Sequence, residues 1–211
     1  MADNPAPTEE RARHWDAAYA GRGSEGVSWY EPVPQMSLHL IQALGTPPDA
    51  AVLDVGGGAS QLVDHLAERG YSDLTVLDIS GHALAEVESR PSASRIVRIQ
   101  KDVLNWQPER RYDLWHDRAL FHFLTSSEDR DRYLLTLRSA IRENGSVVVA
   151  TFATDAPASC SGLPVYGHSV TDLVQVLGVG FELLEARRDE HTTPGGVTQP
   201  FSWVAGHMRP A

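Results

Sequence analysis

The segment at residues 51–60 constrains the fold of this chain more than any other. An apolar run at residues 51–55 is followed directly by three glycines, Gly56, Gly57 and Gly58. Leu62 and Leu66 then repeat at helical spacing, and Gly70 is a residue type that commonly ends a helix. A buried strand, a glycine turn and a helix in this order predict the first unit of a mainly parallel α/β sheet.

The rest of the chain continues this alternation of apolar runs and amphipathic stretches. Further strands are predicted at residues 74–78, 96–99, 112–115 and 146–153, and two antiparallel strands at 181–187 and 201–207. Helices are predicted at residues 62–70, 80–89, 127–142 and 169–177. The predicted fold class is α/β: a Rossmann-like, doubly wound, mainly parallel seven-stranded sheet with an antiparallel C-terminal strand.

The N-terminal part is predicted to be helical and to lie over the sheet. Thr8 with two acidic residues predicts a helix to about Tyr19, which the glycine-rich stretch 21–26 should end. A second helix is expected from Pro34. We define residues 1–45 as the N-terminal helical lid and 50–211 as the core of one domain, residues 1–211. Residues 1–8 contain two prolines and are expected to be disordered.

Composition excludes several classes of protein. The net charge of −10 argues against a nucleic-acid partner, and no apolar run is long enough for a membrane span. A single cysteine, Cys160, excludes an intrachain disulfide and favours a reducing compartment, so a cytoplasmic location is expected. The histidines lack the spacing of metal ligands, so no metal site is predicted. The sequence does not indicate an oligomeric state.

The glycine loop fits either of two cofactors. The N-terminus of the following helix favours an anion, which is the carboxylate of S-adenosylmethionine or the pyrophosphate of a dinucleotide. The dinucleotide fingerprint needs a further glycine where this chain has Gln61. Asp78, at the end of the second strand, can accept hydrogen bonds from the ribose of either cofactor. Asp102, after the third strand, can accept one from an adenine amino group, an arrangement that methyltransferases often use, and this favours S-adenosylmethionine.

Four segments, VLDVGGGAS, LTVLDIS, KDV and YDLWHDRALFHFL, resemble the class I S-adenosylmethionine-dependent methyltransferases. HWDAAY and SWY, which precede the core, are similar to the group that includes eukaryotic lysine methyltransferases acting on elongation factor and citrate synthase. The resemblance covers residues 14–152. Those relatives carry an acid followed by Lys-Gly where this chain has Asp117, Arg118 and Ala119. This departure leaves the methyl acceptor open.

The resemblance implies a set of cofactor-binding residues. The methionine part is assigned to Asp54, Gly56, Gly57 and Gly58, the ribose to Asp78 and Ile79, and the adenine to Asp102 and Val103. By the same resemblance, Asp117 faces the methionine amine or the transfer centre.

The acceptor side is expected at residues 116–123. His116 or His122 would take a proton there near neutral pH, together with Asp117. Arg118 would meet an acidic acceptor or an internal carboxylate, and Phe121 with Phe123 would form an apolar wall. Trp29 and Tyr30 are expected to fold over the cofactor. Buried hydrogen-bonding histidines and core phenylalanines are the competing interpretation.

The resulting hypothesis is methyl transfer from S-adenosylmethionine to a small molecule or a protein side chain. Two alternatives remain at this point. One is a nicotinamide-dependent oxidoreductase, which the missing glycine at Gln61 disfavours. The other is a non-catalytic module that binds S-adenosylmethionine.

Overall fold

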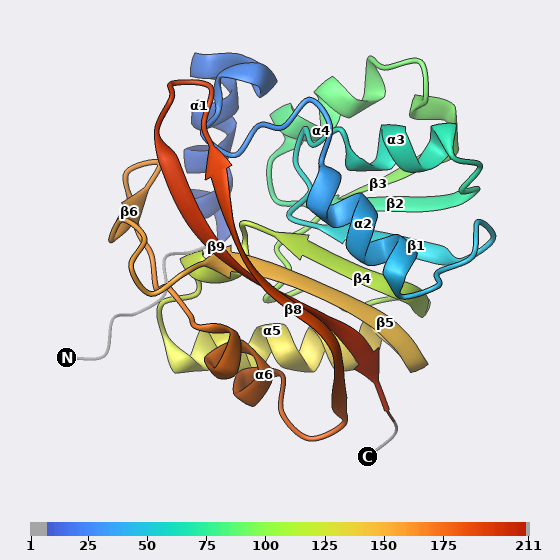
Figure 1. The fold of residues 1–211 in the computed structure, drawn as a ribbon. Coiled ribbons are helices and arrows are strands. Elements are labelled where there is room, and N and C mark those ends of the chain that lie inside the picture. Colours follow the sequence, from blue (N-terminus) through green and yellow to red (C-terminus); the bar gives the residue numbers. More distant parts are fainter. Residues whose placement is uncertain (1–7, 210–211) are drawn as a thin grey trace.

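The computed structural model describes residues 8–209, so the expected disorder ahead of residue 8 lies outside the described residues (Figure 1). One seven-stranded sheet has the order β3-β2-β1-β4-β5-β9-β8. Its strands are β1 (Ala51–Val55), β2 (Asp73–Asp78), β3 (Ile96–Gln100), β4 (Tyr112–Arg118), β5 (Ile141–Phe152), β8 (Phe181–Thr192) and β9 (Thr198–Met208). β9 runs antiparallel to both of its neighbours. The predicted fold class is confirmed.

Helices cover both faces of the sheet, as Figure 1 shows. They are α1 (Thr8–Gly26), α2 (Gln35–Ala43), α3 (Leu62–Glu68), α4 (Gly81–Glu88), α5 (Ser127–Ala140) and α6 (Val170–Leu177), with short 3-10 helices at Ala93–Arg95 and Phe121–Phe123. A two-stranded sheet, β6 (Ser159–Cys160) with β7 (Leu163–Pro164), lies between β5 and α6 in the chain. Among residues 8–209, no helix has both the length and the apolar character needed to cross a membrane.

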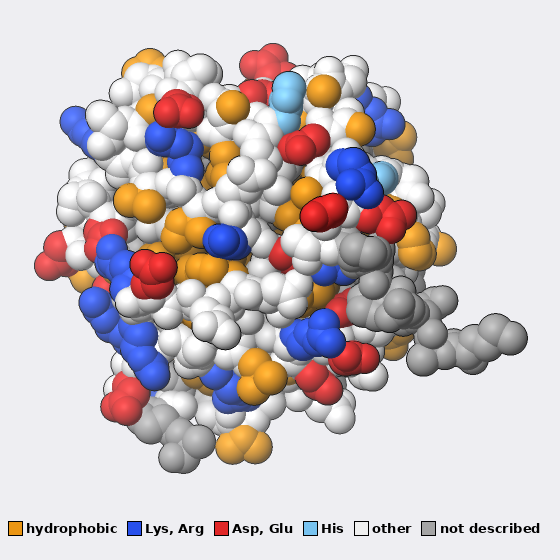
Figure 2. Space-filling view, turned by 180° about the vertical axis from the view of Figure 1, so that it is seen from behind, with side chains coloured by type: hydrophobic (Ala, Val, Ile, Leu, Met, Phe, Trp, Pro, Cys, Tyr) orange, Lys and Arg blue, Asp and Glu red, His pale blue; other side chains and the backbone are white. Residues whose placement is uncertain are grey.

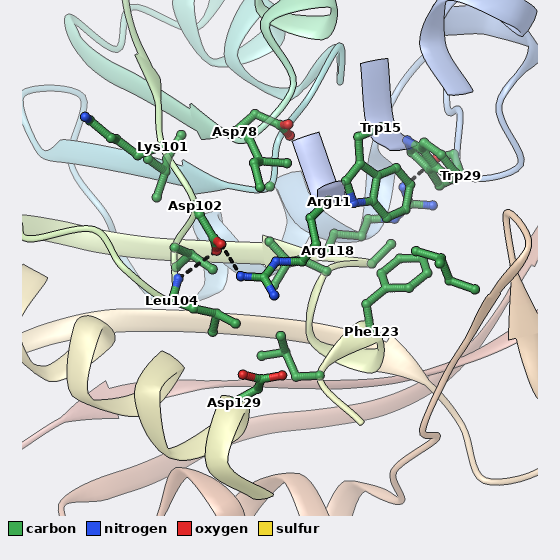
Figure 3. A pocket seen from close by; sticks show the side chains of 18 of the residues that line it. Arg11, Trp15, Trp29, Asp78, Lys101, Asp102, Leu104, Arg118, Phe123 and Asp129 are labelled. Atoms are coloured by element: carbon green, nitrogen blue, oxygen red, sulfur yellow. Dashed lines mark hydrogen bonds and ion pairs between the residues drawn. The ribbon is translucent and has the colours of Figure 1, made fainter. Parts of the chain in front are cut away.

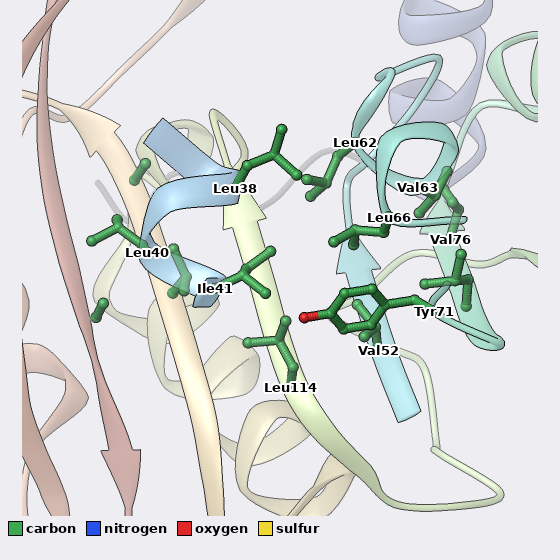
Figure 4. Close-up of a cluster of buried hydrophobic side chains, with 14 of the residues drawn as sticks. Leu38, Leu40, Ile41, Val52, Leu62, Val63, Leu66, Tyr71, Val76 and Leu114 are labelled. Atoms are coloured by element: carbon green, nitrogen blue, oxygen red, sulfur yellow. The ribbon is translucent and has the colours of Figure 1, made fainter. Parts of the chain in front are cut away.

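Two apolar layers hold these helices to the sheet. On one face, α2, α3 and α4 pack against β1, β2 and β4. Leu38 and Ile41 of α2 and Leu62 and Leu66 of α3 belong to this apolar layer (Figure 4). On the other face, α5 and α6 pack through side chains that include Tyr133. Both faces of β1 are buried, which explains the continuous apolar run that predicted it.

Serine hydroxyls fix the beginnings of three helices. The Ser80, Ser126 and Ser169 side chains each accept a hydrogen bond from the backbone N–H three residues on, at the N-termini of α4, α5 and α6. At α6 the Asp172 side chain completes a reciprocal capping box. The Ser80 cap begins α4 directly after β2. Asp78, at the end of β2, therefore lies beside the N-terminus of α4.

Several predicted element boundaries were wrong: β5 begins at Ile141 rather than at residue 146, and β8 continues to Thr192 rather than ending at residue 187. The helix expected to end near Tyr19 continues to Gly26, with a kink at Gly23, where φ is +65°. The fourth strand continues beyond residue 115 to Arg118, because Asp117 and Arg118 pair with Val149 and Ala150 of β5. The polar segment predicted to follow this strand therefore begins inside the sheet.

Candidate active site

Two cavities lie beyond the carboxyl ends of β1, β2 and β4, where parallel sheets of this kind bind ligands. The larger, with a volume of about 160 Å³, is lined by Asp78, Ile79, Asp102, Val103 and aromatic side chains of the lid (Figure 3). The smaller, with a volume of about 30 Å³, lies against the glycine loop. Residues that line both cavities are Tyr19, Trp29, Gly56 and Arg118.

The glycine loop has no room for side chains. Gly56 and Gly58 have φ values of +63° and +52°, in the left-handed region that favours glycine. A Cβ on Gly57 would lie 2.5 Å from Asp54 Oδ2, and one on Gly58 would lie 2.1 Å from Tyr19 Oη. The bare backbone therefore borders the cavities directly.

Asp54 lies beneath this loop and is 2% exposed. Its Oδ1 is 2.7 Å from His116 Nδ1, and His116 Nε2 is 2.9 Å from Ser37 Oγ. Because a carboxylate only accepts hydrogen bonds, the Nδ1–H of His116 donates to Asp54. His116 lines the smaller cavity, and both of its ring nitrogens are engaged by these two partners.

Asp78 faces the larger cavity from the end of β2. Its Oδ1 accepts a hydrogen bond of 2.7 Å from the backbone N–H of Ser80. Burial raises the pKa of Asp78 to about 6, although the backbone N–H groups of Ser80 and Gly58 oppose the rise. Ile79 lines the cavity beside it.

Asp102 also faces the larger cavity, and both of its oxygens have partners. The backbone N–H of Leu104 donates to Oδ1 at 3.0 Å. Oδ2 forms an ion pair with Arg11 and accepts a hydrogen bond of 3.0 Å from the Thr8 hydroxyl. Arg11 and Thr8 belong to α1. The lid therefore contacts Asp102, the residue predicted to bind the adenine.

The structure corrects the placement of Asp117. This side chain is fully buried, lines neither cavity, and accepts hydrogen bonds from the backbone N–H of Leu120 at 3.1 Å and the Tyr133 hydroxyl at 2.6 Å. Burial raises its pKa to about 7. Because side chains alternate along a strand, Asp117 points to the α5 face, away from His116 and Arg118.

His122 and Phe121 are likewise buried outside both cavities, contrary to the roles expected for them. The His122 ring stacks on Phe152, with ring centroids 4.2 Å apart, and its Nδ1 accepts from the backbone N–H of Phe152. Phe121 packs against Tyr133. The competing interpretation, a structural role, fits both side chains better because their rings fill the core.

His122 gives this fold a specific acid sensitivity. Burial lowers the pKa of His122 from an ordinary 6.5 to about 3. Below pH 6.5 the unfolded chain therefore binds a proton there that the folded chain does not, so stability falls as pH falls from 6.5 toward 3. The free energy of unfolding of the parent should fall between pH 7 and 5. In a His122→Gln variant we expect this fall to be about 2 kcal/mol smaller.

Urea unfolding at the two pH values measures this difference. The exposed His82 provides the control, because His82→Gln should leave the loss of stability unchanged. Parallel losses in the parent and the His122 variant would contradict the burial argument.

Arg118 holds the lid to the end of β4. It forms an ion pair of 2.9 Å with Glu31, and its Nη1 donates to the backbone oxygen of Trp29 at 2.7 Å. His191, from β8, lies 3.3 Å from Glu31 and 2.7 Å from the backbone oxygen of Ser28. The predicted internal carboxylate for Arg118 is therefore Glu31, which sequence analysis did not identify.

An aromatic wall, defined by Trp15, Trp29 and Phe123, borders the larger cavity (Figure 3). Trp15 makes edge contacts with both others, with centroids 5.7 Å from Trp29 and 4.8 Å from Phe123. Tyr30 lines the smaller cavity, so both aromatic lid residues predicted over the cofactor lie at a cavity. Trp15 was not among the residues predicted for the site; it lies on α1 one helical turn before Tyr19, and both residues line the larger cavity.

The comparisons with known proteins agree with one another. Residues 52–145 match the family model of a methyltransferase domain. The chain is 27% identical over 202 residues to EEF1A lysine methyltransferase 2 of Danio rerio, covering 88% of this chain and 81% of that protein. It is 30% identical over 170 residues to tRNA1(Val) (adenine(37)-N6)-methyltransferase of Klebsiella pneumoniae, covering 74% and 68%.

A solved structure shows the same fold. The 1,6-didemethyltoxoflavin-N1-methyltransferase of Burkholderia thailandensis, bound to its substrate and S-adenosylhomocysteine, has a TM-score of 0.70 at 18% identity, covering 100% of this chain and 94% of that protein. All three proteins are methyltransferases, which disfavours the nicotinamide alternative. Since the family model includes the glycine loop and the Klebsiella relative matches most of the chain, this protein belongs to the class I S-adenosylmethionine-dependent methyltransferases.

Proposed function

We propose that this enzyme holds S-adenosylmethionine across the two cavities and methylates an amine nitrogen, with a protein lysine side chain as the leading acceptor. The observation that carries the acceptor proposal is the aromatic wall of Trp15, Trp29 and Phe123 beside the larger cavity. When bound, the cofactor supplies a methyl group already activated on a sulfonium, so the protein has to align the acceptor and exclude water.

The residues present fit the cofactor. Asp54 Oδ2 is buried without a hydrogen-bond partner in the described structure, beside a backbone that has no Cβ at Gly57. We place the methionine part in the smaller cavity, against Asp54 and Gly56–Gly58. The ribose would lie against Asp78 and Ile79, and the adenine between Asp102 and Val103.

The adenine position requires an adjustment of the lid. Asp102 Oδ2 is already bonded to Arg11 and Thr8. For Asp102 to accept from the adenine amino group, Arg11 has to share this oxygen or turn aside. The N-terminal part of α1 is therefore the element that we expect to move when the cofactor binds.

The aromatic wall supports an amine acceptor that needs no side-chain base. A lysine ammonium that enters an apolar space loses hydration, which lowers its pKa and favours the neutral amine. The ammonium proton leaves to water first. The neutral amine that results carries the lone pair that attacks the methyl group. This account agrees with the engaged or buried states of His116, His122 and Asp117.

Arg118 lines both cavities, but we propose that it holds the lid rather than an anionic acceptor. Its guanidinium is already engaged by Glu31 and by the backbone oxygen of Trp29. A lysine acceptor is further supported by the 27% identity to EEF1A lysine methyltransferase 2 and by the net charge of −10. A small-molecule amine is the second candidate, because the larger cavity, with a volume of about 160 Å³, also has Leu163 of β7 in its lining.

Charge and composition support further proposals on partners and location. Basic and acidic side chains are interspersed over the face seen in Figure 2, and the net charge is −10. Both features support a protein or small-molecule acceptor rather than a nucleic-acid backbone. The single cysteine of the sequence supports a cytoplasmic location.

We expect Phe123→Ala to slow methyl transfer about 10-fold or more at saturating cofactor, because it opens the aromatic wall to water. The affinity for S-adenosylhomocysteine should change less than about 2-fold, because Phe123 is not among the residues assigned to the cofactor. Tyr166→Ala, at an exposed aromatic outside both cavities, is the control. A Phe123 variant that transfers at the parental rate would contradict a role for this wall.

The acceptor class is tested by supplying the protein and small-molecule fractions of a cell extract separately. Formation of S-adenosylhomocysteine with the protein fraction supports the lysine proposal. Turnover with the small-molecule fraction alone would move the proposal to the second candidate. Methyl esters as the sole product would contradict an amine acceptor.

A further inference from the structure

Two carboxylates that are distant in the sequence each leave one oxygen without a partner at the smaller cavity. Asp54 uses Oδ1 for His116, and Glu31 pairs through Oε1 with Arg118 and His191. Asp54 Oδ2 and Glu31 Oε2 are both buried and have no hydrogen-bond partner in the described part of the chain. Both residues line the smaller cavity.

Unpartnered buried carboxylate oxygens are costly, so their presence together points to a ligand that donates to them. Burial raises the pKa of Glu31, but the hydrogen bond to His191 and the charge of Arg118 outweigh it and leave the pKa below its usual value. Glu31 is therefore ionised at neutral pH. A cationic donor is the chemistry that matches two carboxylates.

We infer that Glu31 of the lid is a further cofactor-binding residue: its Oε2 accepts one N–H of the protonated α-amino group of the methionine part, beside Asp54 Oδ2, which accepts another. This inference rests on the cofactor placement proposed above. An ammonium carries three donors, so it can satisfy both oxygens at once.

The location of the two oxygens separates this cation from the methyl acceptor. They lie at the smaller cavity with Gly57 and Ser60, whereas Phe123 of the aromatic wall lines only the larger cavity. Glu31 belongs to the lid and Asp54 to β1, so one ammonium bonded to both ties the lid to the glycine loop. The fixed partners, Arg118 and His116, keep each carboxylate in place before the ligand arrives.

Calorimetry with two ligands tests the inference without any turnover. One ligand is S-adenosylhomocysteine, and the other is its analogue with hydrogen in place of the α-amino group. We expect Glu31→Gln to weaken binding of S-adenosylhomocysteine about 10-fold and binding of the deaminated analogue less than about 2-fold, as for the loss of one charge-assisted hydrogen bond. Asp54→Asn should show the same selective loss.

Glu190→Gln is the matched control, because Glu190 is an exposed acid on β8 that lines neither cavity. It should leave both affinities unchanged. Equal weakening of both ligands by Glu31→Gln, as expected if Glu31 only supports Arg118, would overturn the inference, and so would an unchanged affinity for S-adenosylhomocysteine. Failure of the parent protein to bind S-adenosylhomocysteine would instead overturn the proposed placement of the cofactor.

Discussion

Replacing Gly58 with valine should weaken S-adenosylhomocysteine binding by at least about 100-fold. Gly58 has a φ of +52°, where a residue with a side chain is strained by about 1–2 kcal/mol. Its Cβ would lie 2.1 Å from Tyr19 Oη and 3.4 Å from Asp78 Oδ2. Valine would therefore displace the Tyr19 hydroxyl, to which Trp29 Nε1 donates at 3.3 Å, and would fill the space beside Asp78.

Gly45→Val is the control that separates backbone strain from obstruction of the cofactor site. The φ of Gly45 is +68°, but a Cβ there would meet nothing within 4 Å, so Gly45→Val carries the backbone penalty alone. We expect the Gly58 variant to lose at least as much thermal stability as the Gly45 variant, and only the Gly58 variant to lose binding. Retention of parental affinity by Gly58→Val, measured by calorimetry, would show that the cofactor does not lie along this loop.

Asp78→Asn should weaken S-adenosylhomocysteine binding about 10- to 100-fold at pH 7, because it replaces a carboxylate that accepts from the ribose hydroxyls by a neutral amide. The pKa of Asp78 is raised to about 6, so the parent protein should lose about 10-fold in affinity between pH 7 and 5 as the carboxylate is protonated. The Asn variant should show no such dependence.

Protonation of Asp78 does not itself destabilise the fold. A carboxyl group whose pKa is raised in the folded state stabilises the fold most at low pH, and this contribution is lost as pH rises through about 6. Removing the charge of Asp78 should therefore leave the fold at least as stable at pH 7. Asp73→Asn, at a surface ion pair with Arg110, is the control. An identical pH profile in the parent and Asp78→Asn would remove Asp78 from the site.

The position of the candidate cofactor site was largely predictable from the sequence. The glycine loop, Asp78 and Asp102 follow strands whose apolar runs are unambiguous, and parallel strands bring their carboxyl ends to one edge. The structure places Gly56, Gly57, Asp78 and Asp102 at the two cavities, whereas Gly58 lines neither. The partners of Asp102 could not be predicted, because Arg11 and Thr8 of the lid lie more than 90 residues away from it in the chain.

The acceptor side was misplaced because β4 is longer than its apolar run. His116 and Arg118 are polar, but each has a partner, Asp54 or Glu31, that hydropathy cannot show. Extending the strand by three residues would have revealed the alternation that turns Asp117 toward Tyr133. Because residues 116–123 were all expected to face the acceptor, the buried His122 was also expected to reach it.

The lid was recognised as aromatic, but its contacts could not be predicted. The Arg118–Glu31–His191 cluster joins β4, the lid and β8, and no spacing in the sequence links these positions. The helix also continued through Gly21, where a Cβ would meet nothing within 4 Å, so glycine there reflects neither a turn nor a close contact.

The central claim is that the aromatic wall admits an amine, so the identity of the methylated atom is the most direct test. The enzyme is incubated with S-adenosylmethionine labelled in its methyl group and with a cell extract, and the labelled protein is hydrolysed and its amino acids separated. The proposal predicts label in N-methylated lysine, absent with Gly58→Val and reduced with Phe123→Ala. Label that is released by mild base as methanol, or that elutes as S-methylcysteine, would contradict it.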